Sequence, residues 1–95
     1  MAYAFLIHGD RDHVGVAIRD LKAGERVTGI YLSSQQVVPL TLSEDIPLGH
    51  KVALTDLGRG DHLLKYNEVI GTVIEPIRVG MHVHIHNLQS VRWAE

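Results

Sequence analysis

The fold is decided by a turn segment near the middle of the chain, Asp45-Ile46-Pro47-Leu48-Gly49-His50-Lys51-Val52. We expect Ile46 to anchor in the core, the next two residues to form a tight turn, and Gly49 to take a positive φ, where a side chain would clash. A strand then begins, and its Val52 points inward again. The pattern recurs in three other segments, Asp20-Leu21-Lys22-Ala23-Gly24-Glu25-Arg26-Val27, Asp56-Leu57-Gly58-Arg59-Gly60-Asp61-His62-Leu63 and Pro76-Ile77-Arg78-Val79-Gly80-Met81-His82-Val83. Four such turns in 95 residues predict a mostly β chain that doubles back repeatedly.

Short apolar runs between these and other turns predict the strands. The expected strands are Tyr3–His8, Val14–Ile18, Val27–Leu32, Val37–Leu42, His50–Leu54, His62–Tyr66, Val69–Glu75 and Met81–His86. A short helix is an alternative for Val14–Lys22, but its valine and isoleucine content favours a strand. Residues 1–95 are expected to form a single domain, because the chain is too short for a second core.

Composition excludes several classes of function. Lysine and arginine number 9 against 11 acidic residues, a net charge of −2, and a nucleic-acid or anionic-membrane module would show a basic excess. Aromatic residues make up 5%, too few for a base-stacking platform, and no apolar run approaches the ~20 residues of a membrane span. The N-terminus lacks the basic region of a signal peptide. The absence of cysteine excludes disulfides and thiolate sites, and is compatible with a cytoplasmic location.

A histidine-rich segment, Met81-His82-Val83-His84-Ile85-His86, alternates between apolar residues and histidine. In a strand this alternation would place the apolar side chains on the core face and the three imidazoles on the opposite face. Three interpretations stay open for the imidazole face: a solvated polar surface, a metal site, or a wall that faces substrate. A histidine pair on one strand supplies two metal ligands, whereas a closed site needs three or four. Asn87, which follows, adds an amide donor and acceptor.

Other polar residues lie where predicted strands begin or end, and each alone is typical of a solvated side chain. They are His8, His50, Lys51, Lys65 and Tyr66. Asp12 is expected to hold the backbone of its own turn rather than to act as a catalytic acid. Trp93 is expected to be a packing anchor or an interface contact.

A family resemblance is carried by motifs that span the chain from about Phe5 to Trp93. They are Ile7-His8, Asp12-His13-Val14, Ile46-Pro47-Leu48-Gly49-His50-Lys51-Val52-Ala53-Leu54, Lys65-Tyr66, Ile70-Gly71 and Val83-His84-Ile85-His86-Asn87. In this order they resemble the SAF domain of the altronate/galactarate dehydratase family, including the separate small subunit of the related sulfolactate sulfo-lyases.

The resemblance implies a β-clip fold, a small all-β domain of folded-over hairpins. It also implies a lyase that removes water or sulfite from a small anionic hydroxy acid, such as altronate, galactarate or sulfolactate. Such enzymes depend on a divalent metal, iron or manganese, which a large catalytic subunit is expected to hold. The chain would then be the small subunit or a detached domain, with association between its own copies left open.

The resemblance also assigns roles to individual residues. The expected catalytic residues are His84, His86 and His50, and the expected substrate-binding residues are Lys51, Lys65, Tyr66, Asn87 and His8. His82 lies outside the family's pattern and is ranked below the others. Asn67 stands where relatives have glycine, and because asparagine tolerates a positive φ the turn should survive. His13 replaces a common asparagine, so a ligand contact there is not expected.

Elimination beta to a carboxylate needs a base, a cation that stabilises the enolate, and an acid for the leaving group. Lysines suit a carboxylate or sulfonate, and histidines suit proton transfer or metal ligation. The sequence therefore predicts a site shared with a large subunit. The alternatives are a non-catalytic assembly module and an autonomous metal-binding protein, for which weak or no metal binding by the isolated chain is expected because a complete ligand set is not visible.

Overall fold

The computed structural model describes residues 2–90 and confirms the expected all-β fold, with no helix among them. None of these residues therefore belongs to a helix that could cross a membrane. The strands are β1 (Phe5–Ile7), β2 (Val14–Ala17), β3 (Arg26–Tyr31), β4 (Val37–Thr41), β5 (Lys51–Ala53), β6 (His62–Lys65), β7 (Glu68–Val73), β8 (His82–Val83) and β9 (Leu88–Ser90). Trp93 lies outside the described residues.

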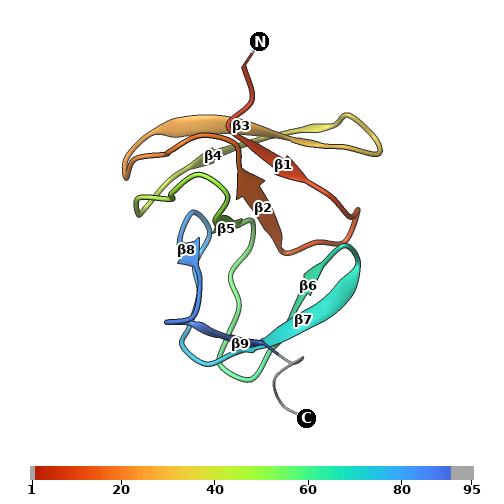
Figure 1. Cartoon of the computed structure of the whole chain (residues 1–95), viewed down its shortest axis with the longest axis vertical. Helices are drawn as coiled ribbons and strands as arrows, with labels where there is room; N and C mark the ends of the chain where they lie inside the picture. The colour runs from red at the N-terminus through yellow and green to blue at the C-terminus, as the bar shows by residue number, and fades with distance from the viewer. Residues whose placement is uncertain (1, 91–95) are drawn as a thin grey trace.

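The strands form two sheets (Figure 1). Six strands make a curled sheet in the order β4-β3-β1-β2-β5-β8, in which only the β1–β3 pair is parallel. Three strands make an antiparallel sheet in the order β6-β7-β9, at the opposite end of the long axis from β3 and β4. This arrangement of folded-over hairpins agrees with the β-clip expectation.

The four recurrent turns adopt the predicted conformation and associate in two pairs. Their glycines have φ values of 89°, 84°, 91° and 86°, at Gly24, Gly49, Gly60 and Gly80. In the first pair Leu21 and Ile46 exchange backbone hydrogen bonds, and in the second pair Leu57 and Ile77 do the same. The anchors are buried as expected, Leu21 and Ile46 in one apolar cluster and Ile77 in another, against which Leu57 packs.

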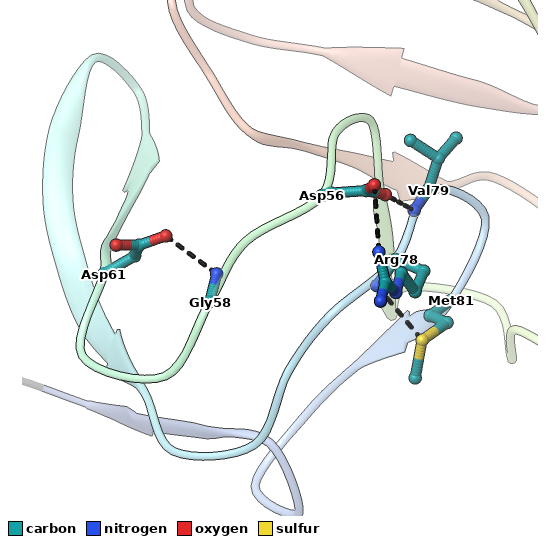
Figure 2. Close-up of polar contacts among 6 residues, drawn as sticks. All are labelled: Asp56, Gly58, Asp61, Arg78, Val79 and Met81. Atoms are coloured by element: carbon teal, nitrogen blue, oxygen red, sulfur yellow. Dashed lines mark hydrogen bonds and ion pairs between the residues drawn. The ribbon is translucent and has the colours of Figure 1, made fainter.

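Aspartates tie the members of each pair together. In the first pair Asp20 accepts from the backbone N–H of Leu48, and Asp45 accepts from that of Ala23, at 2.8 and 2.9 Å. In the second pair Asp56 accepts from the N–H of Val79 at 2.9 Å (Figure 2). The position that corresponds to these aspartates in the fourth turn is Pro76, which has no carboxylate, so the second pair has one such bond from these positions.

The segment 81–86 is not the single strand that its alternation predicts. Strand β8 covers only His82–Val83, and a turn follows at residues 84–87. The cause is Asn87, whose side-chain oxygen accepts from the His84 N–H and whose amide donates to the His82 carbonyl. Ile85 is therefore at the tip of a turn and 80% exposed, not on the core face. The chain after the turn forms β9, which the strand pattern did not predict.

Asp12 has the structural role expected of it, and it reaches further than its own turn. It is buried and accepts from the N–H of Gly9 at 2.9 Å. It also accepts from the N–H groups of Tyr66 and Asn67, at 2.9 and 2.7 Å. Asn67 has a φ of 60°, which confirms that asparagine preserves the turn. The carboxylate therefore joins the β1–β2 connection to the tip of the β6–β7 hairpin.

Candidate functional site

Three imidazoles gather beside the β5–β8 pair, and we call His50, His82 and His84 the histidine cluster. One ring nitrogen of each lies within 4.8 Å of those of the other two. Nδ1 of His50 and Nε2 of His82 are 2.8 Å apart, and the rings of His50 and His84 have centroids 4.6 Å apart. His82 and His84 are stacked, with their planes 11° apart.

Strand register brings these histidines together across 32 positions of sequence. In the antiparallel β5–β8 pair Lys51 lies opposite Val83, and Val52 opposite His82. The next step of the same register brings His50 opposite His84, and the two-residue period puts His82 on the same face. The cluster therefore depends on two of the recurrent turns, one leading into each strand.

Pro47 explains why His50 is available to the cluster. In the other three turns the residue at the position of His50 uses its side chain to accept from the N–H of the third turn residue. These pairs are Glu25 with Lys22, Asp61 with Gly58, and Met81 with Arg78 (the last two in Figure 2). In the second turn the third residue is Pro47, which has no N–H to bind. The His50 side chain is thus freed from the turn and can face His82.

Asn87 fixes the backbone on either side of the link between His82 and His84. Its side chain is 1% exposed, and it bonds the His84 N–H at 2.9 Å and the His82 carbonyl at 2.8 Å. Asn87 is among the residues expected to bind substrate, and its amide lies inside the turn, with both ends bonded to the backbone. Its position suits it to hold His82 and His84 in their relative orientation.

An open cavity of about 700 Å³ lies next to the histidine cluster. It is lined by Lys51, Lys65, Tyr66, Val69, Ile70, Ile74, Val83, His84, Ile85, Leu88, Gln89 and Ser90. The two lysines, His84 and Tyr66 supply its charged or titratable groups, and aliphatic side chains supply most of the rest. A small anion with an apolar or weakly polar body would find both kinds of contact here.

The surroundings favour neutral imidazoles. Burial, followed by the charge of neighbouring His50, lowers the pKa values of His82 and His84 below 6.5. Burial, followed by the nearby charge of Lys65, also lowers the pKa of Lys51. At neutral pH the two imidazoles of β8 and its turn are therefore available as proton acceptors or as metal ligands.

Aromatic and cationic contacts surround Tyr66 at the cavity wall. The Lys65 ammonium group lies 4.5 Å from the centroid of the Tyr66 ring, and the ring of His8 stacks on the same tyrosine with centroids 4.4 Å apart. Tyr66 has a φ of 55°, a conformation held by the bond from its N–H to Asp12. His8 therefore approaches the cavity through Tyr66, while the His13 ring accepts from the Leu64 N–H at 2.9 Å.

The site residues predicted from the sequence thus lie in one region, although His82 joins the cluster in place of His86. His50 and His84 are in the cluster, and Lys51, Lys65 and Tyr66 line the cavity. His86 lies beside His82, with ring centroids 5.4 Å apart, but it does not join the three-nitrogen group found within residues 2–90. His82, which the family pattern ranked lower, does join it. The alternation places His82 on the face of His84, and the register of β5 against β8, which no local motif encodes, brings His50 to it.

Comparison with known proteins gives one consistent family. The sequence profile of the altronate/galactarate dehydratase SAF domain matches residues 3–91. The (2R)-sulfolactate sulfo-lyase subunit alpha of Chromohalobacter salexigens is 36% identical over 94 residues, which are 98% of this chain and 100% of that subunit. The corresponding subunit of Paracoccus pantotrophus is 52% identical over 54 residues, 57% of this chain and 81% of the relative. Altronate dehydratase of Escherichia coli is 40% identical over 79 residues, 83% of this chain but 15% of that enzyme.

Proposed function

Because this chain belongs to the altronate/galactarate dehydratase SAF domain family and is homologous to lyase subunits, we propose that it is the small subunit of a lyase. Its partner would be a large catalytic subunit, and the two would work in the cytoplasm. The substrate would be a small anionic hydroxy acid, a sugar acid or sulfolactate, from which water or sulfite is eliminated. The match to the whole length of a separate alpha subunit supports the two-subunit arrangement.

The observation that carries this proposal is the meeting of two lysines and a neutral imidazole at one cavity. Lys51 and Lys65 line it together with His84. Their ammonium groups suit the carboxylate or sulfonate of the substrate as point charges. A chain that provided only structural support to a partner would have no need of these groups at one cavity.

The imidazoles would handle protons in the elimination. Removal of a proton next to a carboxylate needs a base, and departure of the leaving group needs an acid. A neutral His84 can accept a proton, and the pair His50 and His82 can pass one between ring nitrogens 2.8 Å apart. Lys51, which burial makes easier to deprotonate, binds the substrate anion best while it is charged.

A divalent metal in the assembled enzyme would stabilise negative charge that develops on the substrate carboxylate. We propose that the large subunit supplies most of the ligands for that iron or manganese ion. The donor set of the histidine cluster fits a role beside it, because neutral imidazole binds both protons and divalent transition metals.

The test is turnover of the reconstituted two-subunit enzyme on altronate, galactarate and sulfolactate. We expect His84→Ala to lower kcat about 100-fold or more, the usual contribution of a proton-transfer group, while the subunits still co-purify. Lys51→Met is expected to raise KM, because it removes a charge that binds the substrate anion. His62→Gln is the matched control, since His62 is exposed on β6 and does not line the cavity. Unchanged turnover in both His84→Ala and Lys51→Met would contradict the shared site.

That outcome would favour the second candidate, a non-catalytic assembly module. Apolar surface at the rim of the cavity supports this candidate: Ile85 is 80% exposed, Tyr66 56% and Val69 41%. Ile85→Ser would then weaken association with the large subunit, measured by co-purification, more than His84→Ala does.

A further inference from the structure

We propose that the histidine cluster is a binding site for one divalent transition metal ion, assembled by this chain alone. The sequence pattern of residues 81–86 offers two neighbouring histidines on one strand, too few for a site. The fold adds the third donor, His50, from another strand. One ring nitrogen of each of the three residues lies within 4.8 Å of the others. This inference goes beyond the proposed function, because it needs no partner subunit and no substrate.

The distances suit a metal ion. Two nitrogens that bind one tetrahedral Zn²⁺ at about 2.0–2.1 Å are separated by about 3.3 Å. The observed separations, 2.8 Å between Nδ1 of His50 and Nε2 of His82 and up to 4.8 Å within the group, lie on either side of this value. Small rotations about the side-chain torsions are enough to equalise them. Three imidazole nitrogens select Zn²⁺, Co²⁺, Ni²⁺ or Fe²⁺ over Mg²⁺ or Ca²⁺, which prefer oxygen.

The cluster is held in place before any metal binds. The β5–β8 pairing fixes the backbones on either side of it. Glu44 accepts from the His82 N–H at 2.8 Å, and Asn87 holds the backbone of His84 at 2.9 Å. Pro47 has no N–H with which the His50 side chain could be engaged in its turn. Such preorganisation reduces the loss of side-chain freedom that binding would otherwise require.

The coordination shell would be incomplete on the side of the cavity. Three protein nitrogens leave a fourth position of a tetrahedral ion for an exchangeable ligand, as in catalytic rather than structural zinc sites. His84 belongs both to the cluster and to the cavity lining. The exchangeable ligand would therefore be water, a small carboxylate, or a side chain of a docked protein, and it would enter from the cavity.

The experiment uses the untagged chain of residues 1–95, stripped of metal with a chelator and titrated with Zn²⁺ in a calorimeter and with Co²⁺ in an absorption spectrometer. We expect one ion per chain, and for Co²⁺ the visible bands of a four- or five-coordinate nitrogen site. His82→Gln should weaken binding at least 10-fold, and His50→Gln should do the same. His62→Gln, an exposed histidine on β6, should bind as the unmodified chain does.

Three results would overturn the inference: no uptake of either ion, uptake that the cluster variants leave unchanged, or loss of uptake in the His62→Gln control. Circular dichroism and thermal melting of the metal-free variants establish that they are folded. Because His84 is exposed, His84→Gln provides a further variant whose substitution does not disturb the core. Line broadening by Co²⁺ in NMR spectra of the unmodified chain shows where the ion binds, and it should be strongest at the three cluster residues.

This test is separable from that of the proposed function. Metal binding by the isolated chain, with unchanged turnover of the Lys51→Met enzyme and of the His84→Ala enzyme, would support the metal site and contradict the shared catalytic wall. Loss of turnover in that enzyme, with no metal uptake by the isolated chain, would support the wall and contradict the metal site.

Discussion

The two pairs of recurrent turns share a backbone but differ in what their side chains do. In the first pair, Asp20 and Asp45 each accept a bond from the other turn. In the second pair Asp56 accepts one such bond, and Pro76 has no carboxylate to return it. Within each turn the residue after the glycine usually bonds the turn itself, as Asp61 does in Figure 2. The exception is His50, in the turn whose third residue is Pro47. The same side-chain bond thus stabilises three of the turns. In the turn of His50, Pro47 has no N–H for that bond, and the side chain is free to join the site.

A second difference concerns the space around the turn glycines. An added Cβ at Gly24, Gly49 or Gly60 would meet no heavy atom of residues 2–90 within 4 Å. At Gly80 it would overlap the carbonyl oxygen of Thr41 and press on Ser43. Gly80 is where the fourth turn touches the end of β4, and its carbonyl accepts from the Ser43 N–H at 3.1 Å. The glycine is therefore required for its positive φ alone in three turns, and for both its positive φ and its lack of a side chain in the fourth turn, at Gly80.

The largest expected effect follows from this difference. Gly80→Ala should lower the free energy of unfolding by about 2–5 kcal/mol, because a left-handed alanine costs about 1–2 kcal/mol and overpacking adds about 1–3. Gly49→Ala, at an almost equal φ, should lose only the first contribution. Urea unfolding of both variants makes the measurement. Equal losses would show that the contact with β4 carries no strain.

The turns could be predicted from the sequence because the residues that determine each turn are neighbours in the chain. An apolar anchor, two turn residues and a glycine at a fixed position suffice to predict the backbone, and all four glycines have the positive φ expected of them. The strands that these turns connect were predicted within a few residues of their observed limits. Local chemistry decided each of these features, so no knowledge of the rest of the chain was needed.

The site was harder to predict from the sequence, because it depends on contacts between segments that are distant in the chain. Alternation in residues 81–86 predicted one strand, but the buried amide of Asn87 ends that strand after Val83. Asparagine favours turns, so a local signal for this break was present but weaker than the alternation. The alternation placed His82 on the face of His84, but its meeting with His50 had no local signal. It follows from pairing with β5, a register that becomes visible only in the folded structure.

The difference in aspartate bonds gives the next effect in size. Asp20→Ala combined with Asp45→Ala should destabilise the chain by about 2 kcal/mol, and Asp56→Ala by about 1, if each bond to a backbone N–H contributes about 1 kcal/mol. Asparagine at the same positions keeps the accepting oxygen and is the matched control. Chemical denaturation of the four variants measures the losses. A loss for Asp56→Ala as large as for the double variant would mean that the ion pair of Asp56 with Arg78, 3.4 Å long and exposed, matters more than we infer.

Coupling between Pro47 and His50 tests whether the proline frees the histidine. In the Pro47 background His50→Asp should destabilise the chain, because no N–H is present for the carboxylate to bind. With Pro47→Ala the same substitution should recreate the bond seen between Asp61 and Gly58, 2.7 Å long. A double-mutant cycle of unfolding free energies should give a favourable coupling of about 0.5–1 kcal/mol. Additive effects would contradict this account of the turn.

The smallest expected effect is a loss of stability at acidic pH, caused by the histidine cluster that the turn of His50 helps to form. With metal removed by a chelator, the lowered pKa values of His82 and His84 mean that the unfolded chain binds protons more readily than the folded chain as the pH falls below 6.5. Stability should therefore be full above that pH and decline as the pH falls through the lowered pKa values. The charged or titratable groups that act on these two rings are His50, His86, Lys51 and Glu44, and His84 also acts on His82. The decline should be modest, because solvent screens these partly exposed groups. Replacing both His82 and His84 with glutamine should flatten the unfolding free energy between neutral and mildly acidic pH, and an unchanged slope would show that other residues cause it.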